Sequence, residues 1–221
     1  MASRASGHSA LGWDPDVYPV SDGEMGEGSV HRAVTDLVRA LIAQWLSSRG
    51  ERAFVGSNQF IYWRGKSRKE QIAPDVYVLP GVEPESRIDH WDTRTGVAPS
   101  FVLEVVSKDI PKDYVRAPLR YSEVGVSELV LFDPDAQLST KRALWHVYRH
   151  RGGRFVLSER TARDRVRSTV LGCYLRAVGE GDRQRVRLAT GARGERIFPT
   201  VEEALRRENE KLRAKLRARR R

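Results

Sequence analysis

The sequence has one cysteine, no long apolar run and no apolar segment at its start. Cys173 alone can form neither an internal disulfide nor a CxxC zinc site. No apolar run approaches the roughly 20 residues of a membrane-spanning helix, which excludes an integral membrane protein. Residues 1–12 lack the apolar core of a secretory signal. Together these absences favour the reducing cytoplasm as the location of the protein.

The composition predicts a folded protein with a basic surplus. The 221 residues are 40% hydrophobic and 31% charged, enough to bury the core of one medium α/β domain or two small ones. Lys and Arg total 39 against 29 Asp and Glu, and the net charge of +10 favours a polyanionic partner. Residues 202–221 contain nine bases and four acids, so half of the surplus lies there. Charge alone therefore does not decide whether the body of the protein binds nucleic acid.

The first half of the chain alternates between helical and extended patterns. Residues 1–27 predict an irregular N-terminal arm, and apolar residues at helical spacing predict a helix over 29–48. Aromatic and β-branched residues at 54–63 predict a strand or hairpin, and residues 72–79 predict another strand. Residues 80–99 contain three prolines without a clear period, which predicts a long surface loop.

The second half predicts a β-α-β unit followed by smaller strands. The nearly continuous apolar run at 101–106 indicates a strand covered on both faces. A helix over 112–124 and a strand over 129–132 would complete a right-handed unit. A hairpin over 144–157, short strands at 170–175 and 186–188, and a final helix from Thr200 follow. We therefore predict an α/β domain over 28–200 and a basic helix over 201–221.

An acidic side chain interrupts the most apolar segment. Glu104 stands in the middle of the run FVLEVV, and burying an unpaired carboxylate costs several kcal/mol. Asp75 begins a neighbouring β pattern, so the two carboxylates could share one divalent cation. Oxygen ligands favour Mg²⁺ or Mn²⁺ over zinc. Two alternatives stay open at this point, a salt bridge from Glu104 to an arginine and a turn-capping role for Asp75.

A series of motifs occurs in a specific order. They are residues 72–78 (IAPDVYV), residues 101–107 (FVLEVVS), the segment from Asp113 to Tyr121, the pair Gly125-Val126, and residues 132–135 (FDPD). This series resembles the Uma-type putative restriction endonuclease family of the PD-(D/E)XK nuclease superfamily. The similarity covers roughly residues 20–215 and includes His31. It implies a restriction-endonuclease-like α/β fold with a central mixed β-sheet flanked by helices, and a C-terminal helix.

The resemblance also implies an active site. Asp75 and Glu104 match the two metal-binding carboxylates of the family, and the carbonyl of Val105 matches the usual third ligand. Asp113 and Tyr121 match the helix that follows the second acid. His31 is implied to lie near the edge of the active site. The implied cofactor is Mg²⁺ or Mn²⁺, and the implied reaction is hydrolysis of DNA phosphodiester bonds.

The sequence departs from the family at its usual lysine. The superfamily often has lysine two residues after the second acid, where this chain has Val106, and similar members have it on the next helix, at Ala117. That lysine positions water and stabilises charge on the phosphate. Arg116, Lys108, Lys112 and Arg120 are nearby in the sequence and could take its place, and we assign Arg116 and Lys108 to the site.

The last residues combine an apolar stripe with many cations. Leu205, Asn209, Leu212 and Leu216 have the spacing of about two coiled-coil heptads, which favours a homodimer or higher oligomer through this helix. A solvated basic helix is an equal alternative. The bases in this segment, including Arg213, Lys215 and Arg217, could instead hold a phosphate backbone without sequence specificity.

Three functions are therefore compatible with the sequence. The leading prediction is a Mg²⁺-dependent DNA endonuclease that lacks the usual lysine. The alternatives are a catalytically impaired DNA-binding or assembly module on a nuclease scaffold, and an oligomeric structural protein without a nucleic-acid partner. None of the three involves a membrane.

Overall fold

The computed structural model describes residues 29–64, 70–107 and 109–219. The predicted arm over 1–27 and the candidate Lys108 lie outside these residues. The described helices are α1 (Ser29–Ser48), the π-helical turn η2 (Lys112–Arg116), α2 (Ala117–Val124) and α3 (Val201–Arg219), with two short 3-10 turns, η3 (Ala136–Leu138) and η4 (Gly181–Arg183). Within the described part of the chain, no helix is long and apolar enough to cross a membrane.

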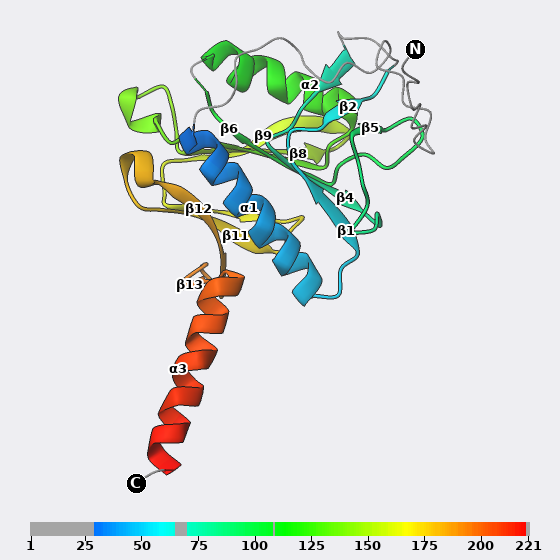
Figure 1. Ribbon diagram of the computed structural model, residues 1–221. Helices are drawn as coiled ribbons and strands as arrows, with labels where there is room; N and C mark the ends of the chain where they lie inside the picture. The colour runs from blue at the N-terminus through cyan, green and yellow to red at the C-terminus, as the bar shows by residue number, and fades with distance from the viewer. Residues whose placement is uncertain (1–28, 65–69, 108, 220–221) are drawn as a thin grey trace, which may run out of the picture.

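A central mixed sheet runs through the body of the molecule (Figure 1). Its order is β1 (Ala53–Gly56), β4 (Val76–Pro80), β6 (Phe101–Val105), β7 (Glu128–Phe132), β8 (Trp145–Arg151) and β9 (Arg154–Thr161). Strands β6 and β7 are parallel and joined through α2, while the other neighbours in this sheet are antiparallel. This confirms the predicted mixed α/β fold and the β-α-β connection over 101–132.

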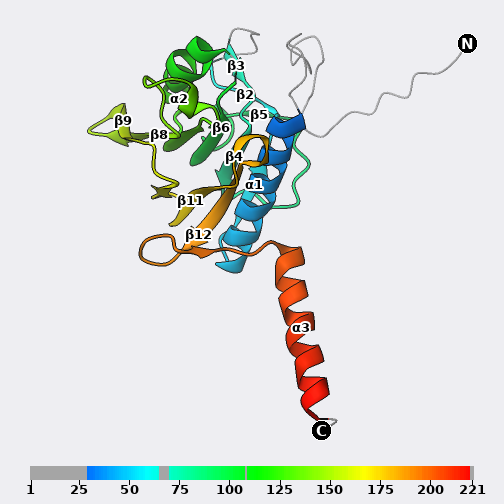
Figure 2. The same cartoon turned by 90° about the vertical axis from the view of Figure 1, so that its left-hand side faces the viewer.

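Two smaller sheets flank the central one. One has the order β3 (Gln71–Ile72), β2 (Phe60–Tyr62) and β5 (His90–Asp92). The other, which we call the C-terminal sheet, has the order β10 (Arg165–Ser168), β11 (Cys173–Val178), β12 (Arg185–Thr190) and β13 (Arg196–Ile197). Figure 2 shows α1 on one side of β11 and β12, and, apart from the first turn of α3, no described helix on the other side.

The central sheet separates two apolar cores. On one face, Val38 and Ile42 of α1 pack with Leu103 of β6 and with buried residues of the C-terminal sheet. On the other face, Tyr121 and Val124 of α2 pack with the residues of the strands that point the opposite way, such as Val102 of β6. The run over 101–106 is apolar because its two faces belong to these two cores.

Proline accounts for the irregular start of the helix over 112–124. Pro118 has no amide hydrogen to donate to the carbonyl four residues earlier, and residues 112–116 form a π-helical turn immediately before it. Gly125 ends α2 with a left-handed φ of 86°, as expected for a helix C-cap. The predicted helix is therefore present, but its first turn is wider than a regular α-helix.

Several strand predictions need correction. Residues 54–63 form no hairpin, because β1 joins β4 whereas β2 joins β3 and β5. The predicted strand over 72–79 is divided at Pro74 into β3 and β4. The predicted loop over 80–99 contains β5, which pairs in parallel with β2. Strand β10 was not predicted. Each of these pairings joins segments that are separate in the sequence, so a local pattern of apolar residues does not predict them.

Helix α3 extends away from the body (Figures 1 and 2). Thr200 caps its start, since the Thr200 hydroxyl accepts a hydrogen bond from the amide of Glu203 and the Glu203 carboxylate accepts one from the amide of Thr200. An ion pair between Glu203 and Arg187 of β12, with the oxygen and nitrogen 2.6 Å apart, anchors this end to the C-terminal sheet. The division of the chain into a domain over 28–200 and a helix over 201–221 stays a prediction.

Candidate active site

Strand pairing brings the two predicted carboxylates together. Val76 of β4 lies opposite Leu103 of β6 in antiparallel register, so Asp75, immediately before β4, lies beside Glu104. The negative charge of Asp75 raises the pKa of Glu104. Both project toward the face of the sheet that α2 covers. Glu104 is two residues after Val102, and Asp75 is two residues before Tyr77, and both Val102 and Tyr77 point to that face.

Asp75 is held by two groups from different elements. Its Oδ2 accepts a hydrogen bond from the Val105 amide over 2.6 Å, and its Oδ1 lies 2.9 Å from Nε2 of His31 on α1. The Asp75 side chain is only 8% exposed. The first turn of α1 therefore reaches Asp75, and the implied role of His31 at an active-site edge stays a prediction. Val105 contacts Asp75 through its amide, and its predicted role as a carbonyl ligand is untested.

Tyr121 fixes the orientation of Glu104. The hydroxyl of this fully buried tyrosine donates a hydrogen bond to Glu104 Oε1. Burial raises the pKa of Glu104 well above its usual range, and the Asp75 and Asp113 carboxylates raise it further, whereas the bond from Tyr121 acts in the opposite direction. Glu104 thus stands where concentrated negative charge requires a proton or a cation.

Asp113 belongs to the same electrostatic cluster. Its Oδ2 accepts hydrogen bonds from the amide and the hydroxyl of Ser107, at 2.6 and 2.8 Å, which close the turn between β6 and the following helix. Burial raises the pKa of Asp113, although the bonds from Ser107 lower it. The predicted residues His31, Asp75, Glu104, Asp113 and Tyr121 are therefore brought together, and we call them the carboxylate cluster.

The donor set of the cluster fits Mg²⁺ or Mn²⁺ in its chemistry. Among the described residues, no three His, Cys, Asp or Glu side chains are arranged to hold a metal ion. Mg²⁺ often binds proteins through only one or two carboxylates and takes its other ligands from water and substrate phosphate. Asp75 and Glu104 supply such a pair, and the raised pKa of Glu104 indicates negative charge that a cation would stabilise.

Arg116 does not contact the cluster. Its side chain is 59% exposed and pairs with Asp109, with nitrogen and oxygen 2.7 Å apart. This placement gives no support to its predicted catalytic role, which stays untested. Arg213, Lys215 and Arg217 are exposed on α3, in the part of the molecule that extends away from the body (Figure 1).

A comparison with known families decides the relationship. The model of the Uma2 family, described as putative restriction endonuclease, matches residues 17–172. The chain belongs to this family. Membership confirms the resemblance stated above and places this Uma2 protein among nucleases of the restriction endonuclease type.

Other comparisons add a structure and no curated relative. A crystal structure of a putative nuclease of the family DUF820, from Anabaena variabilis, is 17% identical with a TM-score of 0.47. The similarity covers 67% of this chain and 76% of that chain. No curated protein matches this chain.

The two positions at which the resemblance implied a lysine, Val106 and Ala117, lie in the apolar core that contains Tyr121. Val106 directly follows β6 and is two residues after Glu104, and Ala117 lies one helical turn before Tyr121. Both side chains are buried in the core between α2 and the sheet. Neither position therefore supplies an amino group to the cluster, although the charge of the neighbouring Lys112 lowers the pKa of Asp113.

The sequence analysis missed a second polar cluster beside the first. Tyr114 donates a hydrogen bond to the fully buried Asp133. Arg142 donates two more, from Nε to Oδ2 over 2.6 Å and from Nη2 to Oδ1 over 2.5 Å. The ring of Tyr114 also packs edge-on against His146, with centroids 4.7 Å apart. The FDPD motif was the available signal, but the side-chain partners of Asp133, Tyr114 and Arg142, come from two segments on either side of it in the sequence. This cluster anchors the π-helical turn to the end of β7.

Proposed function

We propose that this Uma2 protein is a metal-dependent DNA endonuclease whose metal ligands are Asp75 and Glu104. The observation that carries the proposal is the convergence of these two carboxylates from β4 and β6 under Tyr121. A bound Mg²⁺ or Mn²⁺ would supply Lewis-acid stabilisation of the charge that develops on a phosphodiester. Family membership supports a nuclease, and DNA is the substrate that the family description favours.

The protein side chains would prepare the site before substrate binds. The Val105 amide and His31 hold Asp75 in one orientation, and Tyr121 does the same for Glu104. Asp113 holds the turn after β6 through Ser107, which keeps that segment beside the carboxylates. Preorganised ligands of this kind need no rearrangement at the moment of reaction.

The apolar residues at Val106 and Ala117 favour the second candidate, a catalytically impaired DNA-binding module. A nuclease without the lysine loses part of its electrostatic stabilisation of the transition state. Under this alternative the metal and DNA still bind, but cleavage is slow or absent. The basic surplus of residues 202–221 supports DNA binding under either candidate.

Cleavage of a supercoiled plasmid tests the choice. We expect nicking by the wild type in Mg²⁺ or Mn²⁺, loss of nicking in EDTA, and loss in Asp75→Ala. Asp36→Ala, which removes an exposed acid on α1, is the matched control and should nick at the wild-type rate. Equal nicking by Asp75→Ala would contradict the proposal, and binding without nicking would select the impaired module.

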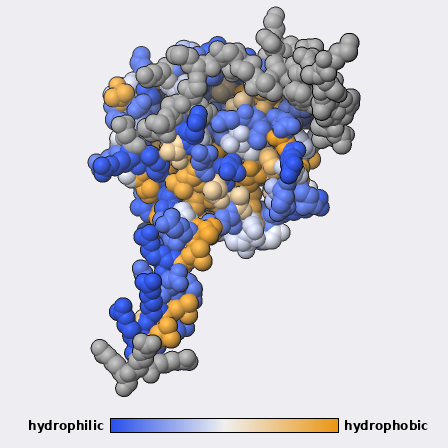
Figure 3. All heavy atoms as spheres, viewed as in Figure 1, coloured by the Kyte–Doolittle hydropathy of each residue, from blue (hydrophilic) through white to orange (hydrophobic). Residues whose placement is uncertain are grey.

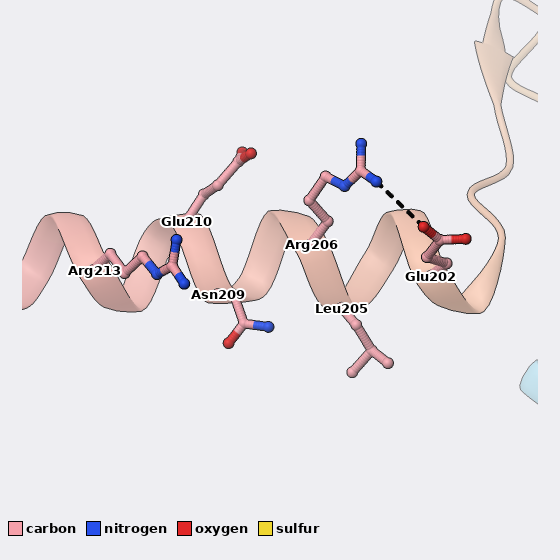
Figure 4. A pocket seen from close by; sticks show the side chains of 6 residues that line it. All are labelled: Glu202, Leu205, Arg206, Asn209, Glu210 and Arg213. Carbon is pink, nitrogen blue, oxygen red and sulfur yellow. Dashed lines mark hydrogen bonds and ion pairs between the residues drawn. The ribbon is translucent and has the colours of Figure 1, made fainter.

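We also propose that α3 pairs in parallel with a second copy of the chain. Leu205, Leu212 and Leu216 are between 47% and 59% exposed and form an apolar stripe along α3, visible in Figure 3. Figure 4 shows Leu205 and Asn209 on the same side of the helix, in a shallow pocket that contains no residue of the carboxylate cluster. The stripe has no cover from the rest of the described chain.

Charge and register favour the parallel arrangement. In a parallel pair, Asn209 meets Asn209 of the partner subunit, the arrangement that fixes register in two-stranded coiled coils. Glu208 then flanks Arg213 of the partner subunit with opposite charge. An antiparallel pair would place Asn209 against a leucine of the partner subunit. Cations near the end of α3 oppose any pairing, so we expect the association to strengthen with salt.

We propose that the protein is located in the cytoplasm, a reducing compartment in which its single cysteine would stay a free thiol. Cys173 is buried in the C-terminal sheet, and burial raises its pKa to about 12. A buried neutral thiol is inert and needs no disulfide partner.

A further inference from the structure

The net positive charge of this protein lies in its C-terminal part. Residues 163–221 contain 18 Lys and Arg and 8 Asp and Glu, a formal charge of +10, equal to that of the whole chain. Residues 1–162, which include every member of the carboxylate cluster, are therefore formally neutral. The family match ends at residue 172, so most of this basic part lies beyond the region that the family model describes.

Arginines occupy the outer face of the C-terminal sheet. Val166, Leu175, Val186 and Leu188 are buried against the core that contains α1. The residues of opposite parity project from the other face, and they include Arg165, Arg167, Arg176 and Arg187. Apart from the first turn of α3, whose Glu203 pairs with Arg187, no described helix lies over that face in Figure 2. We call this surface the arginine face.

The register places like charges directly opposite one another. Arg165 of β10 lies opposite Arg176 of β11, which in turn lies opposite Arg187 of β12. Such pairs are destabilising in a sheet unless acids separate them. Asp164 pairs with Arg165 and Arg176 at 2.8 and 2.9 Å, and Glu203 pairs with Arg187. Internal acids thus hold the central row in place.

A surplus of cations remains around this row. Three arginines are exposed and form no ion pair with any residue that the structure describes: Arg167 on the arginine face, Arg163 just before β10, and Arg183 in the turn η4 between β11 and β12. We count Arg163 and Arg183, at the margin of the sheet, as part of the arginine face. Residues 163–196 contain nine arginines and no lysine. A planar guanidinium binds phosphate oxygens through two parallel hydrogen bonds, which suits a phosphate backbone better than a point charge does.

We propose that the arginine face binds the phosphate backbone of duplex DNA, separately from the carboxylate cluster. The choice of DNA rests on the proposed nuclease function. The face offers phosphate-specific donors on a rigid sheet, so it would bind DNA without sequence preference. The binding surface and the hydrolytic site would then belong to different parts of the chain, one basic and one formally neutral.

Binding of a fluorescent duplex in EDTA tests this inference, because cleavage plays no part in the measurement. The test variant is Arg163→Gln/Arg167→Gln/Arg183→Gln. The matched control is Arg87→Gln/Arg151→Gln/Arg154→Gln, which removes three exposed arginines from the formally neutral part. Thermal melting of both variants checks that the fold is retained.

We expect the test variant to bind at least about ten-fold more weakly at low salt, and the control less than about two-fold. The slope of log affinity against log salt should shrink by about 0.9 for each lost phosphate contact. Equal losses in both variants, no loss in the test variant, or no binding by the wild type would overturn the inference. Binding to phosphatidylserine vesicles instead of the duplex would overturn it as well.

This outcome is distinguishable from failure of the proposed function. Normal duplex binding through the arginine face, combined with no plasmid nicking in Mg²⁺ or Mn²⁺, would leave the inference standing and contradict the endonuclease. Nicking that depends on Asp75, with duplex affinity unchanged in the test variant, would do the reverse.

Discussion

The raised pKa of Glu104 is a consequence of the residues that surround it. A carboxylate in an apolar strand, beside Asp75 and below the buried Tyr121, meets a local charge that only a proton or a cation can offset. The sequence alone indicated this residue, because burying an unpaired acid inside the apolar run FVLEVV is energetically costly. The contact between His31 and Asp75 could not be derived from spacing, since it joins α1 to β4.

The missing lysine gives a gain-of-function prediction at the residue scale. Ala117 lies one turn before Tyr121 on the face of α2 that meets Glu104, so an amino group there could reach the carboxylate cluster. We expect Ala117→Lys to raise the rate of plasmid nicking at least about ten-fold, by restoring electrostatic stabilisation of the transition state.

The control for this variant is Leu119→Lys on the same helix. Leu119 is 65% exposed, so a lysine there adds the same charge away from the cluster. Unchanged nicking by Ala117→Lys in a protein that melts normally, or an equal gain in Leu119→Lys, would contradict the geometry described for α2.

His146 gives a prediction of pH dependence. Its ring is 4% exposed, and burial, with the nearby Arg160, lowers its pKa to about 4. The unfolded chain therefore binds a proton near pH 6.5 that the folded protein accepts only near pH 4. Stability from this group is present above pH 6.5 and is lost as the pH falls toward 4, by about 3 kcal/mol.

Urea denaturation at several pH values measures this effect. We expect His146→Phe to reduce the loss of unfolding free energy between pH 6.5 and 4 while keeping an aromatic ring against Tyr114. An identical pH dependence in the variant and the wild type would show that His146 does not carry it.

At the scale of elements, Glu128 connects the central sheet to the C-terminal sheet. This fully buried acid on β7 pairs with Arg149 of β8 at 2.5 Å and accepts hydrogen bonds from Ser168 of β10 and from Thr169. One carboxylate therefore holds three segments. The predicted β-α-β unit was correct because its signals were local, whereas this connection joins positions that no local pattern relates.

We expect Glu128→Ala to lower the free energy of unfolding by about 3–5 kcal/mol, because it leaves the half-buried Arg149 without its carboxylate partner. Glu83→Ala, which breaks the exposed pair between Arg52 and Glu83, should cost less than about 1 kcal/mol. Chemical denaturation measures both. Similar small losses in the two variants would contradict the role of Glu128 as the link between the sheets.

At the scale of the whole molecule, the chain combines an acidic site, a basic sheet face and an extended helix. The mixed sheet and the carboxylate pair could be predicted, the first from apolar runs and the second from the family motifs. The arginine face could not, because β10 was missed and the alignment of its arginines depends on the register of three strands.

Dimerisation through α3 is the prediction at this scale. Sedimentation equilibrium should show a dimer for the wild type. The dimer should be tighter at about 0.5 M salt than at about 0.05 M, because salt screens the repulsion between the cations of the two helices. We expect Leu212→Glu to be a monomer and Ala214→Glu, on the opposite side of the helix, to remain a dimer. A monomeric wild type at both salt concentrations, or a dimeric Leu212→Glu, would contradict parallel pairing of α3.

The central claim is that Asp75 and Glu104 together bind one hard divalent cation. The most direct measurement is the electron paramagnetic resonance signal of free Mn²⁺ during titration with protein, compared among the wild type, Glu104→Gln and the control Asp36→Ala. We predict that the wild type and Asp36→Ala remove one equivalent of free Mn²⁺, and that Glu104→Gln binds at least about ten-fold more weakly because it lacks one ligand charge. Equal binding of Mn²⁺ by all three proteins, or no binding by the wild type, would contradict the claim.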